Sequence, residues 1–325
     1  MIQKSNIKKT WPGLLLAIII GSLSYQLKSA IGSPLLDPLL IALIIGIIIR
    51  SIIGNNSRLI PGFNFASAIF IPIGVVFYGA ISLDFIKFSK IDIKYSILLL
   101  AIIFVYFMII LLLGKILKQK KQITYLTATG SAICGASAIT ITSRGVNADP
   151  DDISISLLSV FITAIFGLFI LFPFLANFFN MTDQVYALFA GSILQFSGFV
   201  KAAAGGLDQE FLNLATSIKT FRYLGLLIAL PLFASLIRKK IYFPWFLWAF
   251  LGAGLLFSFA PVVAKIFTPS FEVIQVLFWS IAMAAIGLNA NIQALLSDNG
   301  VKALLMSFVG FFAAIVTFLL GISII

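Results

Sequence analysis

Two basic residues, Lys219 and Arg222, have the types and the spacing to bind an anion within a membrane. A separation of three places them on one face of a helix. The apolar run 223–237 is too short to cross a bilayer, which needs about 20 residues. Extending it back to Ala215 draws both cations into or just under the outer interface. Placing a cation at the bilayer centre costs roughly 2.5–3.5 kcal/mol. A role in binding an anion would explain why two cations are present there. The alternative is that both side chains extend to the headgroups.

The composition is that of a polytopic membrane protein. Of 325 residues, 61% are hydrophobic and 10% are charged, and the mean hydropathy is +1.13, unlike any soluble domain. The net charge of +11 does not indicate nucleic-acid binding, because the basic residues cluster in short loops between apolar runs. The absence of histidine excludes His-ligated metals, Ser-His-Asp catalysis and imidazole relays. The single cysteine, Cys134, excludes an internal disulfide, and we expect no metal or cofactor.

Eleven apolar runs predict an all-α membrane protein of about 11 transmembrane helices, forming one domain over residues 1–325. The runs lie near 11–27, 35–53, 65–83, 95–116, 122–143, 153–177, 184–204, 215–237, 244–264, 271–293 and 301–325. If all eleven cross, the dense basic clusters 115–121 and 238–240 share one side, which the positive-inside rule makes cytoplasmic. We therefore expect the N-terminus inside and the C-terminus outside. The inner side then carries thirteen basic residues and the outer side nine, and Arg144, Asp149, Asp151 and Asp152 are among the charged residues outside.

An internal repeat relates two distant parts of the chain. Residues 79–94 align with residues 287–302 without a gap, so that Gly79 meets Gly287 and Lys94 meets Lys302. The repeated segments, near 65–116 and 271–325, would run through the membrane in opposite directions, as inverted repeats of secondary transporters do. The alternative is that apolar sequence of low complexity aligns by chance.

Two segments, the fifth and the seventh, are rich in small and polar residues at their centres. Such residues let helices pack closely. Alternatively, the helices are discontinuous at mid-membrane, and the amides of a half-helix N-terminus bind an anion. The hydroxyl groups of the fifth segment favour this second interpretation. The candidate substrate-binding residues from the two segments are Gly130, Ser131, Gly135, Ser137, Ser192 and Gln195.

Four motifs carry a resemblance to a known family. They are Pro-Gly-Leu-Leu-Leu-Ala at 12–17, Ile-Cys-Gly-Ala-Ser-Ala-Ile at 133–139, Lys219 with Arg222, and Ala-Met-Ala-Ala-Ile-Gly-Leu at 282–288. Through them nearly the whole chain resembles the bacterial sulfate exporters, multi-pass proteins of the inner membrane. The resemblance implies a secondary transporter with crossed, broken helices, similar to bile-acid and sodium–proton carriers. Where that family typically has a His-Glu pair, this chain has Leu194-Gln195, which leaves proton coupling and the family's cargo in question.

The leading hypothesis is an alternating-access carrier for a small anion, sulfate or a related oxyanion or sulfonate, moved by export across the bacterial inner membrane. Lys219 and Arg222 would supply charge, and the hydroxyls and amides of the fifth segment would supply hydrogen bonds. An alternative is a cation- or proton-coupled carrier of an organic acid. A membrane-embedded enzyme ranks below both, because only the 149–152 acidic cluster could serve it. The expected partners are the anion, the lipid bilayer and a second copy in a homodimer, but not nucleic acid.

Overall fold

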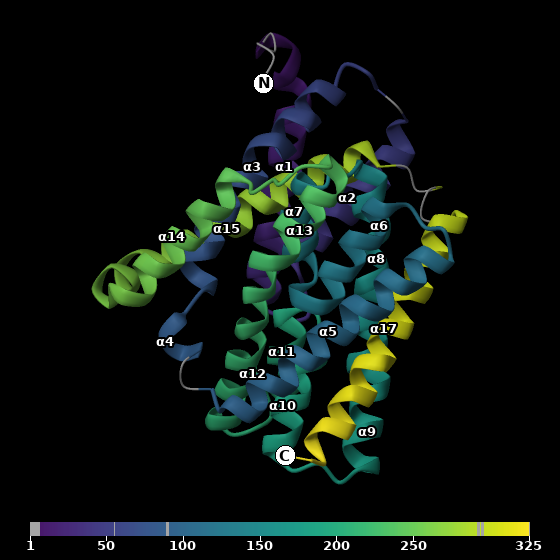
Figure 1. Ribbon diagram of the computed structural model, residues 1–325. Coiled ribbons are helices and arrows are strands. Elements are labelled where there is room, and N and C mark those ends of the chain that lie inside the picture. Colours follow the sequence, from purple (N-terminus) through teal and green to yellow (C-terminus); the bar gives the residue numbers. More distant parts are fainter. Residues whose placement is uncertain (1–6, 55, 89–90, 291–292, 294–295, 325) are drawn as a thin grey trace.

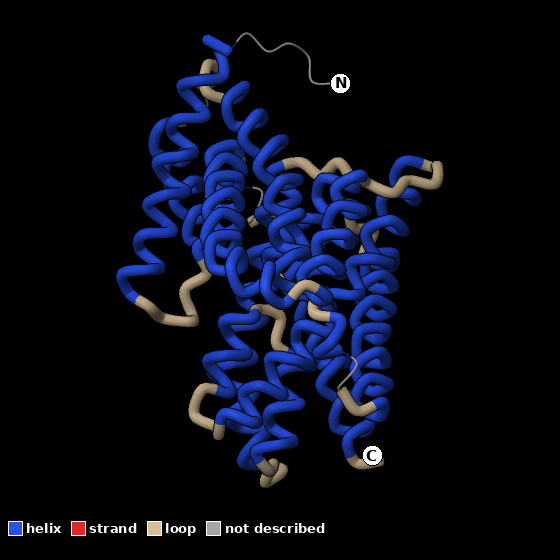
Figure 2. The backbone as a smooth tube through the Cα atoms, turned by 90° about the vertical axis from the view of Figure 1, so that its left-hand side faces the viewer, coloured by secondary structure: helices blue, strands red, loops and turns tan. Residues whose placement is uncertain are grey.

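The computed structural model describes residues 7–54, 56–88, 91–290, 293 and 296–324, and every regular element among them is a helix (Figure 1, Figure 2). Seven described segments are long and apolar enough to cross a membrane. They are Thr10–Ile31 within α1 (Ile7–Ile31), α3 (Ile60–Ser82), α5 (Ile93–Ile116), the run Pro150–Phe178, the run Gln209–Arg238, α15 (Pro261–Asn289) and α17 (Asp298–Ile322). Two apolar helices, α2 (Pro38–Ile53) and α14 (Trp245–Phe259), are shorter. A single turn, α4 (Phe85–Phe88), lies between α3 and α5.

Two of the long segments change helical geometry along their length. Pro150–Phe178 comprises α8 (Pro150–Phe166), the π-helical turn η2 (Gly167–Leu171) and α9 (Phe172–Phe178). Gln209–Arg238 comprises α12 (Gln209–Phe221), the 3₁₀ turn η3 (Arg222–Gly225) and α13 (Leu226–Arg238). Such local departures from the α-helix are common at functional positions.

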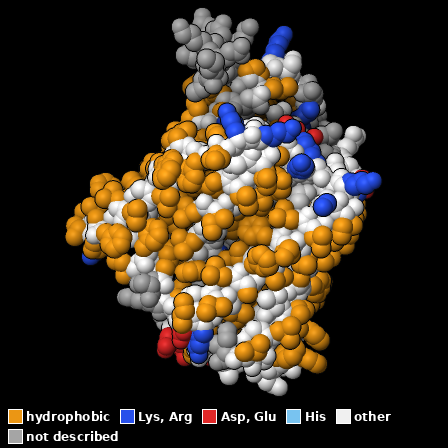
Figure 3. All heavy atoms as spheres, viewed as in Figure 1, with side chains coloured by type: hydrophobic (Ala, Val, Ile, Leu, Met, Phe, Trp, Pro, Cys, Tyr) orange, Lys and Arg blue, Asp and Glu red, His pale blue; other side chains and the backbone are white. Residues whose placement is uncertain are grey.

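Hydrophobic side chains cover most of the face shown in Figure 3, with basic side chains gathered at one end and a small charged cluster at the other. On α5, for example, Leu100, Phe104, Met108 and Leu112 recur every four residues and are at least half exposed. Exposure of such an apolar stripe to water would be unfavourable, whereas in a membrane the stripe contacts the apolar lipid chains. Lysines and arginines collect at the end of the molecule where α1 begins (Figure 3). We call this end the N-terminal face and the opposite end, where the chain finishes, the C-terminal face (Figure 1).

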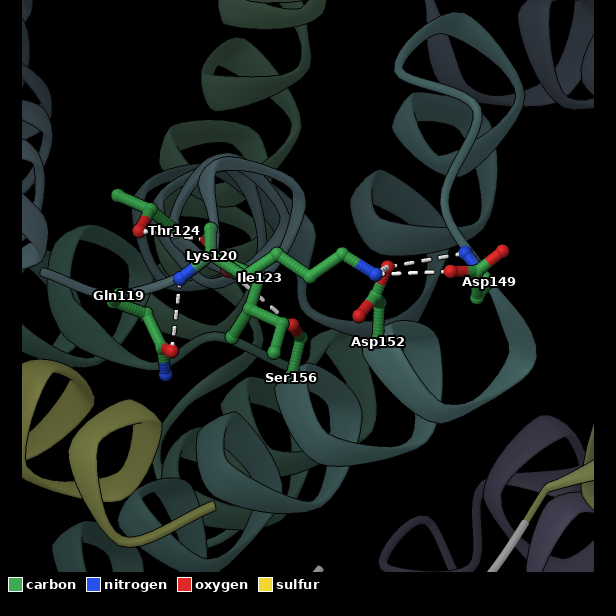
Figure 4. Close-up of polar contacts among 7 residues, drawn as sticks. All are labelled: Gln119, Lys120, Ile123, Thr124, Asp149, Asp152 and Ser156. Carbon is green, nitrogen blue, oxygen red and sulfur yellow. Dashed lines mark hydrogen bonds and ion pairs between the residues drawn. The ribbon is translucent and has the colours of Figure 1, made fainter. Parts of the chain in front are cut away.

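The fifth predicted segment does not cross the membrane but turns back on itself. It consists of α6 (Lys121–Thr129), the π-helical turn η1 (Gly130–Cys134) and α7 (Ala136–Gly145). Lys120, just before α6, lies 2.9 Å from Asp149 and 2.8 Å from Asp152, just after α7 (Figure 4). A straight helix would hold these ends more than about 30 Å apart. The segment is therefore a re-entrant hairpin that enters and leaves at the N-terminal face.

The seventh predicted segment forms a second hairpin from the opposite face. Its arms are α10 (Asp183–Ile193) and α11 (Ser197–Ala204). At the start of α10, the Gln184 amide donates to the Tyr95 hydroxyl (3.1 Å), at the beginning of α5. On the return arm, Gly198 lies against the carbonyl of Pro34, between α1 and α2. Both arms thus belong to the C-terminal face, where Figure 1 places α10, α11 and α12.

The prediction of about 11 transmembrane helices was therefore wrong in two segments, although helices occupy all eleven. Each hairpin arm has only 8 to 14 residues before or after its break, about half of a span. The hairpins also change the predicted sidedness, because Arg144 and the 149–152 acidic cluster share the N-terminal face with the 115–121 cluster. The acidic residues there cap α8 through a reciprocal Asp149–Asp152 capping box.

The helices pack as two bundles. In the first, which we call the scaffold bundle, α15 packs against α1, α2 and α3, and α14 packs against α3. In the second, the hairpin bundle, α5, α8, α12, α13 and α17 surround the two hairpins. The bundles meet where α3 contacts α7 and where α15 contacts α8. This division places both hairpins on the same side of one interface.

The segments of the predicted repeat run in opposite directions and pack against each other. Along α3 and α15, Asn64 is beside Asn289 and Phe77 is beside Phe271, so the pair is antiparallel. Likewise Gly310 on α17 lies against Ile110 on α5. Residues 291–292 and 294–295 of the second copy lie outside the described residues. An inverted repeat in the whole fold stays a prediction.

The first hairpin makes a testable prediction about sidedness. In a Cys134→Ser background, single cysteines Lys121→Cys and Ala148→Cys should react with a membrane-impermeant thiol reagent from the same side of the membrane, because both positions lie at the N-terminal face. Labelling of sealed and inverted membrane vesicles measures this. Reaction from opposite sides would mean that the fifth segment spans the bilayer.

Candidate functional site

The two cations lie at mid-membrane rather than near an interface. Lys219 and Arg222 fall close to the middle of the Gln209–Arg238 span, and their exposed fractions are 1% and 0%. The expected position under the outer interface was wrong because α12 continues back to Gln209, well before Ala215. Neither side chain extends to the headgroups.

Lys219 directs its ammonium group at the tips of both hairpins. Its Nζ donates to the carbonyl of Ile133 (2.7 Å), at the end of η1. It also donates to the carbonyls of Leu194 (2.9 Å) and Gln195 (2.6 Å), at the end of α10. An ammonium has three donors, so this geometry uses all of them on backbone oxygens.

Arg222 makes a parallel set of contacts one turn further along. Its Nε and Nη2 donate to the carbonyls of Ala132 (2.9 Å) and Ser131 (2.7 Å), and its Nη1 donates to the carbonyl of Leu194 (2.8 Å). The guanidinium carbon also lies 5.8 Å from the ring centroid of Tyr106, within cation–π range. The planar fork of arginine thereby bridges the same two hairpins.

These contacts follow from how the entering arms end. The last carbonyls of a helix have no intrahelical donor, and the C-terminus carries the negative end of the helix dipole. Here η1 and α10 both end in the membrane interior, at Cys134 and Ile193. An unsatisfied buried carbonyl costs about 1–3 kcal/mol. The two cations therefore satisfy groups that lipid could not.

A cavity of about 390 Å³ adjoins the hairpin tips and extends to Asp37 and Lys201, on the side of the C-terminal face. Both bundles line it. The scaffold bundle contributes Asp37, Pro38, Leu39, Tyr78, Ile81, Ser82, Glu272, Gln275 and Val276. The hairpin bundle contributes Cys134, Ser137, Phe196, Ser197, Gly198, Val200, Lys201, Thr216, Lys219, Thr220 and Tyr223.

The returning arms of both hairpins begin at the wall of this cavity. Ser137 is in the first turn of α7, and Ser197 and Gly198 are in the first turn of α11. The first amides of a helix lack intrahelical acceptors and carry positive partial charge. The Ser197 hydroxyl is 2.7 Å from the Tyr223 hydroxyl, which also faces the cavity. Two helix N-termini and several hydroxyls thus converge on one space.

The charged side chains of the cavity are of both signs. Lys219 lies at its inner end, and Lys201 lies on α11. The carboxylates are Glu272 on α15 and Asp37, which caps α2 by accepting from the amides of Leu39 and Leu40. Burial raises the pKa of Asp37, whereas those two amides and Lys28 oppose the rise. Because both carboxylates come from the scaffold bundle, the positive potential is concentrated on the hairpin side.

The structure separates the predicted site residues into two groups. Lys219 and Ser137 line the cavity, and Gly135 forms the tip between Cys134 and α7. The other group lies behind the cavity wall: Gly130, Ser131, Ser192, Gln195 and Arg222. Of these, Ser131, Gln195 and Arg222 take part in the cation–carbonyl contacts, and the Gln195 amide donates to the Tyr106 hydroxyl (3.4 Å).

Sequence reasoning missed several residues that line the cavity. Tyr78, Tyr223 and Gln275 come from three separate helices. Gln275 had a usable signal in the sequence, since it is the one polar residue in the run 273–279. The tyrosines had none, because aromatic residues are common throughout the chain.

A second cavity, of about 920 Å³, lies between the same bundles at the opposite face. Pro61 and Asn64 of α3 and Trp245 and Phe246 of α14 line one side. Arg144 and Arg238 are among the residues of the other side, with Asn147 and Tyr242. The Arg238 guanidinium lies 3.9 Å from the Tyr242 ring centroid. The two cavities approach the hairpin region from opposite faces.

Taken together, these features define a multi-pass membrane protein with two opposed re-entrant hairpins joined by buried cations. The family model described as "Conserved hypothetical protein 698" matches residues 12–307, and the chain belongs to this family. It is 31% identical over 316 residues to a UPF0324 membrane protein of Streptococcus agalactiae, covering 92% of each chain. It is 26% identical over 347 residues to a UPF0324 membrane protein of Clostridium tetani, covering 98% of each. No solved structure matches the chain.

The tip of the first hairpin depends on a glycine. Gly135 has φ 64° and ψ −123°, which suits glycine almost alone, and an added Cβ would lie 3.0 Å from the Phe196 ring. We predict that Gly135→Ala lowers the free energy of unfolding by about 1–3 kcal/mol, measured by thermal or denaturant unfolding in detergent. Gly206→Ala is the control, because a Cβ there meets open space. Equal stability of both variants would contradict the strained tip.

Proposed function

We propose that this protein is a secondary transporter that moves a small anion across the membrane by alternating access. One observation carries the proposal: the positive ends of both returning arms, α7 and α11, face a single cavity at the bundle interface, beside buried Lys219. Helix N-termini are ready-made anion sites, and transporters place their sites at mid-membrane where interrupted helices meet.

Lys219 would act on the anion mainly as a charge. Its three donors already bond to backbone carbonyls, so hydrogen bonds to the anion would come from elsewhere. The amides at the start of α7 and α11 and the hydroxyls of Ser137 and Ser197 are placed for this role. The two kinds of group then have different roles: the helix dipoles and hydroxyls give direction, and the ammonium adds attraction through a medium of low dielectric.

The two cavities support the alternating-access part of the proposal. Both lie between the scaffold and hairpin bundles but open to opposite faces. A small displacement of one bundle against the other would close one cavity and deepen the other. The described conformation is the one in which the hairpin tips communicate with the C-terminal face.

The cargo we favour is sulfate or a related oxyanion or sulfonate. A cavity of about 390 Å³ accommodates such ions, and the resemblance drawn from the sequence points the same way. A carrier of an organic acid coupled to a cation ranks second, because the same donors would bind a carboxylate. An enzyme ranks third, since the Asp149 and Asp152 carboxylates already cap α8 and pair with Lys120.

We assign the N-terminal face to the cytoplasm. Helix order and the Lys120 ion pairs place most loop cations on that face: Arg50, Arg58, Lys115, Lys118, Lys120, Lys121, Arg144, Arg238, Lys239, Lys240 and Lys302. The positive-inside rule orients membrane proteins by such loops. With this orientation the described conformation faces outward.

The single cysteine offers a direct test of occupancy. Cys134 lines the cavity at the first hairpin tip and is 4% exposed. We predict that a small methanethiosulfonate reagent labels it slowly, and that sulfate slows labelling further relative to chloride at equal ionic strength, because the anion covers the tip. Mass spectrometry of the intact protein measures the rate.

The matched control for that measurement is Ser137→Ala, which removes one cavity hydroxyl and should weaken protection several-fold while leaving the rate in chloride nearly unchanged. The same comparison with taurine and with carboxylates separates the favoured cargo from the organic acids. Labelling rates that are identical in all of these anions would contradict an anion site at the hairpin tips.

A further inference from the structure

Among the described residues, the Lys219 ammonium donates hydrogen bonds only to backbone oxygens, which form a cage around it. One carbonyl comes from the first hairpin (Ile133, 2.7 Å) and two come from the second (Leu194, 2.9 Å; Gln195, 2.6 Å). Within the described part of the chain, no carboxylate lies within ion-pair distance of this group. The ammonium is therefore held by carbonyl dipoles and by the negative ends of two helices.

Such a cage is the kind of site that binds a free cation in carriers with interrupted helices. Unwound carbonyls and the C-terminal ends of half-helices coordinate Na⁺ or take part in proton coupling there. Carbonyl rings also bind K⁺ by replacing its water shell. In this protein the position is already filled by a side chain, and a free cation could not enter without displacing it.

We infer that the Lys219 ammonium is a covalently attached substitute for a coupling cation, and that the protein works without Na⁺ or K⁺. The second half of this inference rests on the proposed transport function, whereas the first concerns binding alone. Substrate movement would then depend on the anion gradient and the membrane potential.

Arg222, one helical turn from Lys219, has a different role. Arg222 reaches Ser131, Ala132 and Leu194 through three separate nitrogens of its planar group. The three acceptors suit the planar guanidinium group and not a spherical ion. An alkali cation therefore could not replace Arg222 in these contacts. Lysine carries a compact point charge, and only its cage resembles an ion site. Leu194, whose carbonyl accepts from both cations, couples the two groups.

The test removes the ammonium and asks whether a free cation takes its place. In the purified full-length Lys219→Ala variant, three carbonyls would converge on a space once held by the lysine head group. We expect a lower thermal unfolding temperature in N-methylglucamine chloride, and recovery by several degrees in KCl or NaCl at equal ionic strength. K⁺ should restore more than Na⁺, because an ammonium is closer to K⁺ in size.

Two variants control the test. Lys201→Ala removes a lysine from the same cavity without touching the hairpin carbonyls, and its unfolding temperature should not distinguish K⁺ from N-methylglucamine. Lys219→Gln fills the space with a neutral amide and should show little recovery. Absence of any cation-specific recovery in Lys219→Ala would overturn the inference.

If Lys219→Ala fails to fold, the unfolding temperature of the wild-type protein tests the inference instead. Its unfolding temperature should be the same in NaCl, KCl and N-methylglucamine chloride, since the cage is filled, and specific stabilisation by Na⁺ or K⁺ would overturn the inference. None of these measurements involves an anion substrate. Cation recovery without any stabilisation by sulfate, taurine or carboxylates would refute the proposed function alone, whereas anion stabilisation with a Na⁺-dependent wild type would refute the inference alone.

Discussion

The structure depends on how the carbonyl ends of two half-helices are satisfied inside a membrane. Lys219 and Arg222 each donate three hydrogen bonds to these carbonyls, and both reach Leu194. Lipid offers no donor at this depth, so neither hairpin could end where it does without the cations. The cations in turn are stabilised by the carbonyls and helix dipoles, which offsets the cost of placing charge at mid-membrane. The cations and the carbonyl ends of the half-helices therefore stabilise each other.

This arrangement also explains the polarity of the cavity. Because the entering arms direct their carbonyl ends at the cations, the returning arms direct their amide ends at the cavity. Breaking a helix at mid-membrane thus separates its negative and positive ends, and the cations neutralise the negative ends. What remains for a ligand is a surface of amides and hydroxyls with a positive charge behind it. The scaffold bundle supplies the opposite wall, with Tyr78 and Gln275.

The sequence predicted the helices well and their paths less well. Hydropathy located all eleven helical segments, since lipid demands apolar helices of recognisable length. It did not distinguish a discontinuous span from a hairpin, because that difference depends on which face the chain returns to. The deciding contact is the ion pair of Lys120 with Asp149 and Asp152, and charge at a loop does not reveal its partner. The error moved Arg144 and the acidic cluster to the wrong face.

The same reasoning found the residues of the site but not all of their roles. The cations, Gly135 and Ser137 stood out because polar and small residues are costly in an apolar helix unless they serve a purpose. Sequence spacing indicated that Lys219 and Arg222 share a helix face, yet their backbone acceptors are 24 to 91 positions away. Tyr78 and Gln275 come from the other bundle, and only the fold brings them opposite the hairpins.

Exchange of labelled anion across proteoliposomes tests the central claim most directly. Vesicles loaded with unlabelled sulfate, sulfite, thiosulfate, taurine or a carboxylate would receive a trace of the same labelled anion outside. The account predicts that labelled uptake of at least one anion of this series is saturable and rises, with transient accumulation, when the same anion is present inside, which is the behaviour of a carrier with one site that alternates between faces. Labelled uptake that does not change with the internal anion would contradict the account. So would the absence of protein-dependent uptake for every member of the series.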